Sequence, residues 1–138
     1  MIPMAMPTSR HTTQALLLFA VAMLLPALAL WLRVTPAWRP WVAGWLGGVS
    51  VATFAIYAWD KQRAIKAGGR TPEATLHLLE LLGGWPGALL AQHLLRHKNA
   101  KRSFQVMFWI IVLIHEYVAL DWLLHWQIAK RVGSLLGA

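Results

Sequence analysis

Two long stretches without a charged residue constrain this chain more than any other feature of its sequence. Residues 12–32 form an uncharged run of 21 residues, and residues 41–59 form a second run of 19. A helix needs about 20 mostly apolar residues to cross the ~30 Å hydrocarbon core of a bilayer. Residues 103–126 are also apolar and aromatic apart from a few ionisable side chains. We therefore expect an all-α integral membrane protein with spans at 12–32, 41–59 and 103–126.

The composition agrees with this class. Charged residues make up 13% of the chain, about half the share in an ordinary soluble domain. A length of 138 residues allows a single membrane domain over residues 1–138. The chain has no cysteine, which excludes disulfides and thiolate metal sites.

The first apolar run has a second interpretation, as a cleaved signal peptide. Arg10 precedes the run, and Ala27-Leu28-Ala29 near its end has the small-residue spacing of a cleavage site. No soluble domain follows the run, so we expect a retained span instead.

The second run has features of a span whose two ends lie at the membrane interfaces and whose surface can contact another helix. Aromatic side chains near both of its ends are typical of an interfacial belt; they are Trp41, Trp45, Tyr57 and Trp59. Gly44 and Gly48 form a small-xxx-small pair that would allow a second helix to approach closely. A homo-oligomer is therefore possible, although glycine is also common in membrane helices without such a role.

Residues 72–95 are predicted to form a broken helix. Thr71 is a suitable N-cap, with Pro72 and Glu73 in the first turn. The run Gly83-Gly84-Trp85-Pro86-Gly87 interrupts the apolar segment, and it predicts a turn at 83–87. Each arm has about ten residues, or ~15 Å of helix, which is roughly half the core thickness.

Charge distribution separates a re-entrant or interfacial hairpin from a fourth span. If residues 72–95 cross the membrane, the two sides carry seven and six Lys/Arg, and no orientation is specified. If they fold back, one side of the membrane carries nine Lys/Arg and the other side carries four. The positive-inside rule then places the N-terminus in the cytoplasm. The nine are Arg10, Lys61, Arg63, Lys66, Arg70, Arg96, Lys98, Lys101 and Arg102. We prefer the hairpin; four transmembrane helices are the alternative.

The basic residues of these two loops are the predicted ligand-binding surface. Positive charges beside a membrane attract anionic lipid, and arginine can grip a phosphate with two hydrogen bonds. The predicted lipid- or phosphate-binding residues are Arg70, Arg96, Lys98, Lys101 and Arg102. Four further residues are expected to have structural polar roles: Asp60, Lys61, Glu73 and Glu116.

A hairpin would also bring histidines to similar depth. His77 lies level with His93 in such a hairpin, and Glu73 lies level with His97. Imidazole and carboxylate groups bind zinc and similar divalent metals. The sequence thus allows a metal at His77, His93 and His97, although hydrogen-bonded interfacial histidines explain the same pattern without a cofactor.

The last span carries ionisable residues that are costly in hydrocarbon and often functional. His115-Glu116 begins like a zinc-protease motif, but position 119 is alanine, so that motif is absent. Glu116 relays protons, pairs with a basic residue of the hairpin, or packs in neutral form with a hydrogen bond to His115. Asp121 and His125 lie one turn apart and are expected to pair.

Several spaced motifs in the middle of the chain match one family in order. They are Tyr57-Ala58-Trp59-Asp60-Lys61, Arg70-Thr71-Pro72-Glu73, Leu76, Gly83-Gly84-Trp85-Pro86-Gly87, Arg96-His97-Lys98, Lys101 and Phe104. Together they resemble the domain of unknown function 1294 family, small bacterial membrane proteins that are sometimes joined to a cold-shock domain. The resemblance covers residues 57–104 and implies no established activity. Asn99 stands where the family pattern often has threonine after His-Lys.

These observations favour a non-enzymatic protein of the bacterial inner membrane, with several spans and a basic cytoplasmic surface that binds anionic lipid headgroups or a partner protein. The alternative is a metal- or phosphate-dependent membrane enzyme or ion carrier that uses the Glu/His set of the hairpin. The eleven residues before the first span are too few for a cold-shock barrel, so we do not expect nucleic acid as a partner. The sequence contains no known phosphate loop or serine-nucleophile motif.

Overall fold

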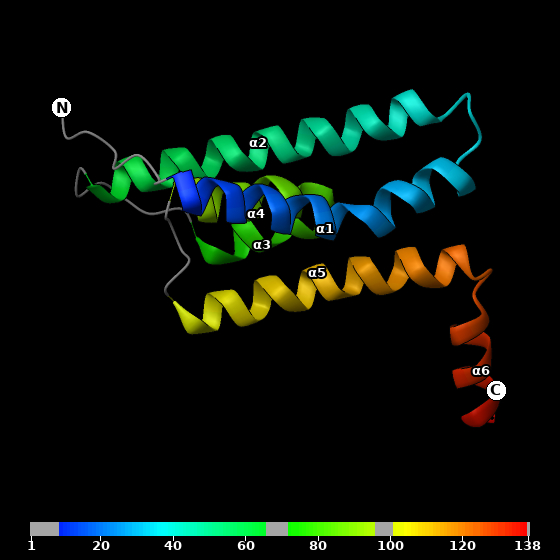
Figure 1. The fold of residues 1–138 in the computed structure, drawn as a ribbon. Coiled ribbons are helices and arrows are strands. Elements are labelled where there is room, and N and C mark those ends of the chain that lie inside the picture. The colour runs from blue at the N-terminus through cyan, green and yellow to red at the C-terminus, as the bar shows by residue number, and fades with distance from the viewer. Residues whose placement is uncertain (1–8, 66–71, 96–100, 138) are drawn as a thin grey trace.

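A computed structural model describes residues 9–65, 72–95 and 101–137 of the chain (Figure 1). Within these ranges every regular element is helical and there is no β-strand. The elements are α1 (Ser9–Arg33), α2 (Arg39–Ile65), α3 (Glu73–Leu79), the kinked turn η1 (Glu80–Gly84), α4 (Trp85–Leu94), α5 (Arg102–Leu123) and α6 (Gln127–Leu135).

Three of the described helices are long and apolar enough to cross a membrane, as the sequence predicted. They are Thr12–Arg33, Arg39–Arg63 and Arg102–Leu123, with mean hydropathies of 2.5, 1.4 and 1.7. Each presents large apolar side chains outward, among them Leu17, Val51 and Leu113, which are 62–71% exposed. Apolar side chains of this kind are compatible with a hydrocarbon environment. A helix also satisfies its own backbone hydrogen bonds, which such an environment requires.

Arg39, the first residue of α2, bonds to the end of α1 across the short connection between the two helices. Its Nε donates a hydrogen bond to the carbonyl of Val34 at 3.1 Å, and its Nη2 donates to that of Trp31 at 2.5 Å. The guanidinium also lies 4.3 Å from the centre of the Trp31 ring. The last carbonyls of a helix have no partner within it, and Arg39 therefore completes the C-terminus of α1.

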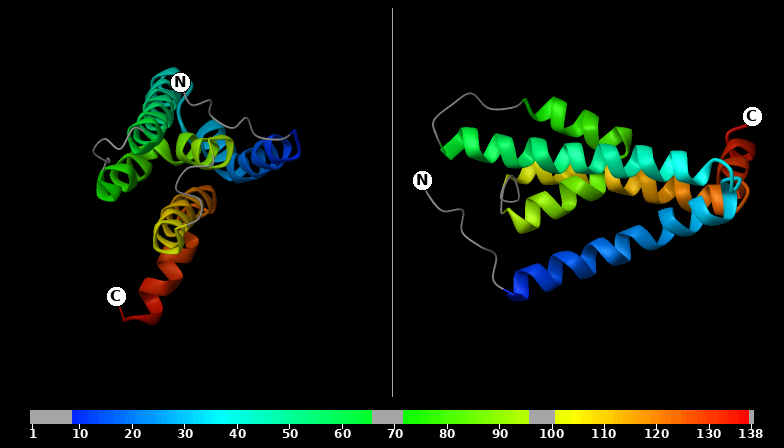
Figure 2. Two further views of the ribbon diagram at one scale, coloured as in Figure 1. Left: turned by 90° about the vertical axis from the view of Figure 1, so that its left-hand side faces the viewer. Right: turned by 90° about the horizontal axis from the view of Figure 1, so that it is seen from above.

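The chain reverses direction between α3 and α4. Gly83 has φ +110°, which is accessible to glycine and strained for other residues. Figure 2 shows α3 running toward the middle of the bundle and α4 returning to the end from which α3 began. We call residues 73–94 the hairpin. In it, α4 packs against α1 and α2, while α3 packs against α2 and α5.

The buried core is built around this hairpin. Leu76 and Leu89 from its two arms are fully buried, as is Phe108 of α5. Further members of the cluster are Tyr57, Trp85, Ala88, Ala91, Phe104 and Val112. The hairpin is therefore the centre around which the three long helices assemble.

The C-terminal part of the chain differs from the prediction. The last long helix ends at Leu123 instead of continuing to 126, and α6 runs across the direction of the long helices (Figure 1). The expected pair of Asp121 and His125 is wrong. Asp121 accepts hydrogen bonds from the Tyr117 hydroxyl at 2.9 Å and from the backbone N–H groups of Ile128 and Ala129 at 2.9 and 3.1 Å.

Candidate functional site

The candidate site is a buried polar network between the hairpin and the long helices, and Tyr57 is at its centre. Sequence patterning assigned Tyr57 to an interfacial belt together with Trp41, Trp45 and Trp59. The three tryptophans are indeed 59–74% exposed, but Tyr57 is 0% exposed. The assignment of Tyr57 is therefore wrong: its side chain points into the bundle.

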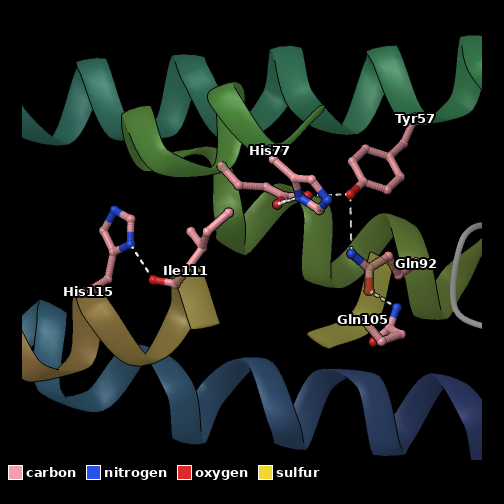
Figure 3. A network of polar contacts seen from close by, with 7 residues as sticks. Tyr57, His77, Gln92, Gln105, Ile111 and His115 are labelled. Carbon is pink, nitrogen blue, oxygen red and sulfur yellow. Dashed lines mark hydrogen bonds and ion pairs between the residues drawn. The ribbon is translucent and has the colours of Figure 1, made fainter. Parts of the chain in front are cut away.

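Five side chains from five elements form a continuous hydrogen-bonded chain (Figure 3). The Tyr57 hydroxyl donates to Glu80 Oε1 at 2.5 Å, and His77 Nδ1 lies 2.7 Å from Glu80 Oε2. Gln92 Nε2 donates to the Tyr57 hydroxyl at 3.2 Å, and Gln105 Nε2 donates to Gln92 Oε1 at 2.8 Å. In a continuous helix Glu80 and Gln92 would be ~18 Å apart, so Tyr57 reaches both only because the chain reverses.

Glu80 carries the carboxyl group of this network and is fully buried. Burial raises the pKa of Glu80, whereas the hydrogen bonds from Tyr57 and His77 and the charge of His77 lower it. Both carboxyl oxygens have a partner. A buried carboxyl group that is paired in this way fixes the positions of its neighbours.

The tip of the hairpin presents three consecutive backbone carbonyls to side chains of the long helices. Trp45 Nε1 donates to Leu82 O at 3.2 Å, and the Ser50 hydroxyl donates to Gly83 O at 3.4 Å. His115 Nε2 lies 3.2 Å from Leu81 O. The turn at Gly83 breaks the helical ladder, and Pro86 has no N–H to offer. Trp45 and Ser50 of α2 thus supply donors where the helical backbone has none.

Close approach of α4 to α2 depends on glycine. A Cβ atom added at Gly87 would overlap the backbone carbonyl of Ser50. A Cβ added at Gly84 would overlap the hydroxyl of Thr53 and the carbonyl of Leu79. Glycine at these two positions therefore sets the distance between the helices.

Charged residues secure the open end of the hairpin, and three of the four predicted structural polar residues lie there. Lys61 donates to the carbonyl of Leu95 just after α4. Lys101 Nζ at the start of α5 forms an ion pair with Glu73 Oε1 at 2.5 Å. Asp60 on α2 is fully buried. The fourth predicted residue, Glu116, lies in the second half of α5, away from this end. Its Oε1 is buried and has no hydrogen-bond partner among the described residues.

The predicted lipid- or phosphate-binding residues are described only in part. Lys101 and Arg102 are exposed at the start of α5, whereas Arg70, Arg96 and Lys98 lie outside the described residues. Arg10 at the start of α1 and Arg63 near the end of α2 are also exposed. Figure 1 shows that these helix termini lie at one end of the bundle, which we call the basic end.

The histidines proposed as metal ligands face different partners. His77 Nδ1 contacts Glu80, while His93 Nδ1 lies 2.9 Å from the carbonyl of Leu89 in its own helix. The described part of the chain contains no group of three or more His, Cys, Asp or Glu residues suited to a metal. His97 lies outside it, so the metal set of His77, His93 and His97 stays a prediction.

Sequence reasoning missed Tyr57, Gln92 and Gln105 as network members. A signal was present on α2, where Ser50, Thr53, Tyr57 and Asp60 follow spacings of three, four and three. Such spacing places them on one face of a helix. A polar stripe within an otherwise apolar span marks the face that packs against protein.

One family match covers most of this site. Residues 50–104 match the family described as "Protein of unknown function (DUF1294)". The resemblance predicted from the sequence is confirmed for this part of the chain. The DUF1294 segment begins at Ser50 and ends at Phe104, so it contains the whole hairpin, the part of α2 from Ser50 onward and the first turn of α5, but not Trp45 or Gln105. No curated protein and no solved structure matches the chain.

Proposed function

We propose that this is a non-enzymatic protein of the bacterial inner membrane whose basic end lies in the cytoplasm and binds anionic lipid headgroups. The distribution of charge along the bundle carries the proposal. Arg10, Lys61, Arg63, Lys101 and Arg102 belong to the basic end. The connections α2–α3 and α4–α5, which join helices at this end, contain Lys66, Arg70, Arg96 and Lys98. The opposite end has Arg33, Arg39, Lys130 and Arg131. Nine positive charges against four favour a cytoplasmic basic end.

The hairpin is proposed to enter the membrane from the cytoplasm and return. Its second arm, α4, has 10 residues and a length of ~15 Å, about half of the hydrocarbon core. Irregular backbone is tolerated at such depth only where protein groups satisfy it. The bonds from Trp45 and Ser50 to the carbonyls of Leu82 and Gly83 support this placement.

The proposal of headgroup binding is supported by a difference among the basic residues: some bond to the protein and others are exposed. Lys61 donates to the carbonyl of Leu95, just after the hairpin, and Lys101 pairs with Glu73 in its first arm. The side chains of Arg63 and Arg102 are exposed. A positive charge near an anionic membrane surface contributes about 1 kcal/mol of attraction. Arginine also forms bidentate hydrogen bonds with phosphate oxygens.

Replacing Arg63 and Arg102 together with glutamine is expected to weaken binding of phosphatidylglycerol by roughly 30-fold, which corresponds to about 1 kcal/mol for each charge. Binding is measured by native mass spectrometry of detergent-solubilised protein, with phosphatidylcholine as the reference lipid. The matched control, Arg63→Lys with Arg102→Lys, keeps both charges and is expected to keep most of the preference for the anionic lipid. If the glutamine variant retains the full preference, headgroup binding by this surface is excluded, and an acidic partner protein becomes the better explanation.

A further inference from the structure

The C-terminal helix α6 has two chemically different sides. Its apolar residues recur at helical spacing and share one side; they are Ile128, Val132, Leu135 and Leu136. The polar residues occupy the other side; they are Gln127, Lys130, Arg131 and Ser134. A short helix with this division is suited to a boundary between an apolar and an aqueous phase.

The apolar side of α6 is not covered by the described part of the protein. No residue of α6 is buried. Val132 is 49% exposed and Leu135 is 85% exposed. These side chains would lose the benefit of burial if water surrounded them.

The direction of α6 is fixed by its junction with α5. His125 and Trp126 have φ angles of 55° and 63°, which is uncommon for residues other than glycine. The fully buried Asp121 then accepts hydrogen bonds from the first backbone N–H groups of α6, those of Ile128 and Ala129. These bonds cap the helix and hold it at a steep angle to α5, at the end of the bundle opposite the basic end, where it projects away from α1 and α2 (Figures 1 and 2).

We propose that α6 binds the lipid–water interface of the leaflet opposite the hairpin. A helix that leaves the end of a span at a steep angle can lie along the membrane surface, and the proposal places its exposed apolar side toward the acyl chains. Lys130 and Arg131 then extend toward lipid phosphates, as basic residues do at membrane interfaces. The occupant is the bilayer itself because the exposed sides of the neighbouring spans are apolar up to this end, with Leu120 and Leu124 of the α5 terminus exposed. The inference rests on membrane placement of the long helices but not on headgroup binding at the basic end.

Site-directed spin labelling tests the proposal, since the chain has no native cysteine. Single cysteines are placed at Val132 and Leu135 on the apolar side, and at Lys130 and Ser134 on the polar side. The full chain is reconstituted in vesicles of phosphatidylethanolamine and phosphatidylglycerol, and collisions with oxygen and a water-soluble nickel complex are measured. Labels at Val132 and Leu135 are expected about 5–10 Å below the headgroup boundary, and labels at Lys130 and Ser134 in water.

A label at Leu113, an exposed residue of α5, is the control for membrane placement. If Leu113 reports hydrocarbon while all four α6 labels report water, the interfacial role of α6 is overturned and the membrane placement stands. Shielding of Val132 from both oxygen and nickel would indicate contact with protein, and it would overturn the proposal in favour of a second copy of the chain.

Discussion

Replacing Gly87 with alanine is expected to destabilise the protein by about 3 kcal/mol, near the upper end of the usual range for overpacking. The new methyl group would overlap the carbonyl of Ser50, which belongs to the backbone of α2. Because a backbone atom cannot rotate away as a flexible side chain can, α2 and α4 must separate. Separation would weaken the bonds from Trp45 and Ser50 to the tip of the hairpin. Stability is measured by titrating SDS into mixed micelles and following helix content.

Gly48→Ala is the matched control for this substitution. Gly48 is in α2, and a Cβ atom added there meets nothing within 4 Å. Alanine has a higher helix propensity than glycine, by up to about 1 kcal/mol, so this variant should be unchanged or slightly more stable. Equal loss of stability in the two variants would contradict the close packing of α4 on α2.

Replacing Glu80 with leucine is expected to cost about 3 kcal/mol of stability, because the partners of a buried carboxyl group lose their acceptor. The Tyr57 hydroxyl and His77 Nδ1 each contact one oxygen of this group. The variant is compared with Tyr57→Phe and with the double variant, under the same SDS titration. The two substitutions should be strongly non-additive since they remove the same hydrogen bond. Additive losses would mean that Tyr57 and Glu80 are not coupled.

The same substitution at Glu116 provides the control. Glu116 is also an acidic residue with a buried oxygen, but that oxygen has no partner in the described structure. Glu116→Leu removes a polar group from the apolar environment of α5 and is expected to leave stability unchanged or to increase it. A loss as large as that of Glu80→Leu would indicate that Glu116 has a partner of comparable importance.

The elements that sequence alone predicted well are those with a strong local signal. Uncharged runs long enough to cross a bilayer predicted two of the long helices, and the glycines at 83 and 84 predicted the break where the chain reverses. The predicted turn at 83–87 is too long, because Trp85, Pro86 and Gly87 already belong to α4. Periodicity and turn chemistry depend on neighbouring residues only, so a single sequence is sufficient for them.

The direction of individual side chains was less predictable. Tyr57 lies near the end of an apolar run, where an aromatic residue can face either the interface or the protein interior. His77 and His93 were expected at equal depth, but depth does not determine which face of a helix a side chain occupies. In the structure His77 faces Glu80, whereas His93 bonds back to Leu89. The contacts of Tyr57 with Glu80 and Gln92 join residues distant in sequence, so its direction is set by tertiary structure.

The end of α5 had no local signal. Residues 124–126 are Leu, His and Trp, without glycine or proline, yet two of them adopt positive φ. The break is stabilised by Asp121, whose carboxylate oxygens accept hydrogen bonds from the backbone N–H groups of Ile128 and Ala129 in α6. A carboxylate within an apolar run can pair, relay protons or cap a following helix, and the sequence does not distinguish these roles.

Cysteine accessibility in intact bacteria tests most directly whether the hairpin returns to the side of the membrane on which it begins. Single cysteines are introduced at Gln62, before the hairpin, at Asn99, after it, and at Ala37 in the connection between α1 and α2. Each is treated from outside with a membrane-impermeant maleimide. We predict that Ala37 is labelled and that Gln62 and Asn99 stay protected until the membrane is opened. Labelling of Asn99 in intact cells, with Gln62 protected, would show that residues 72–95 cross the membrane and would contradict the re-entrant hairpin.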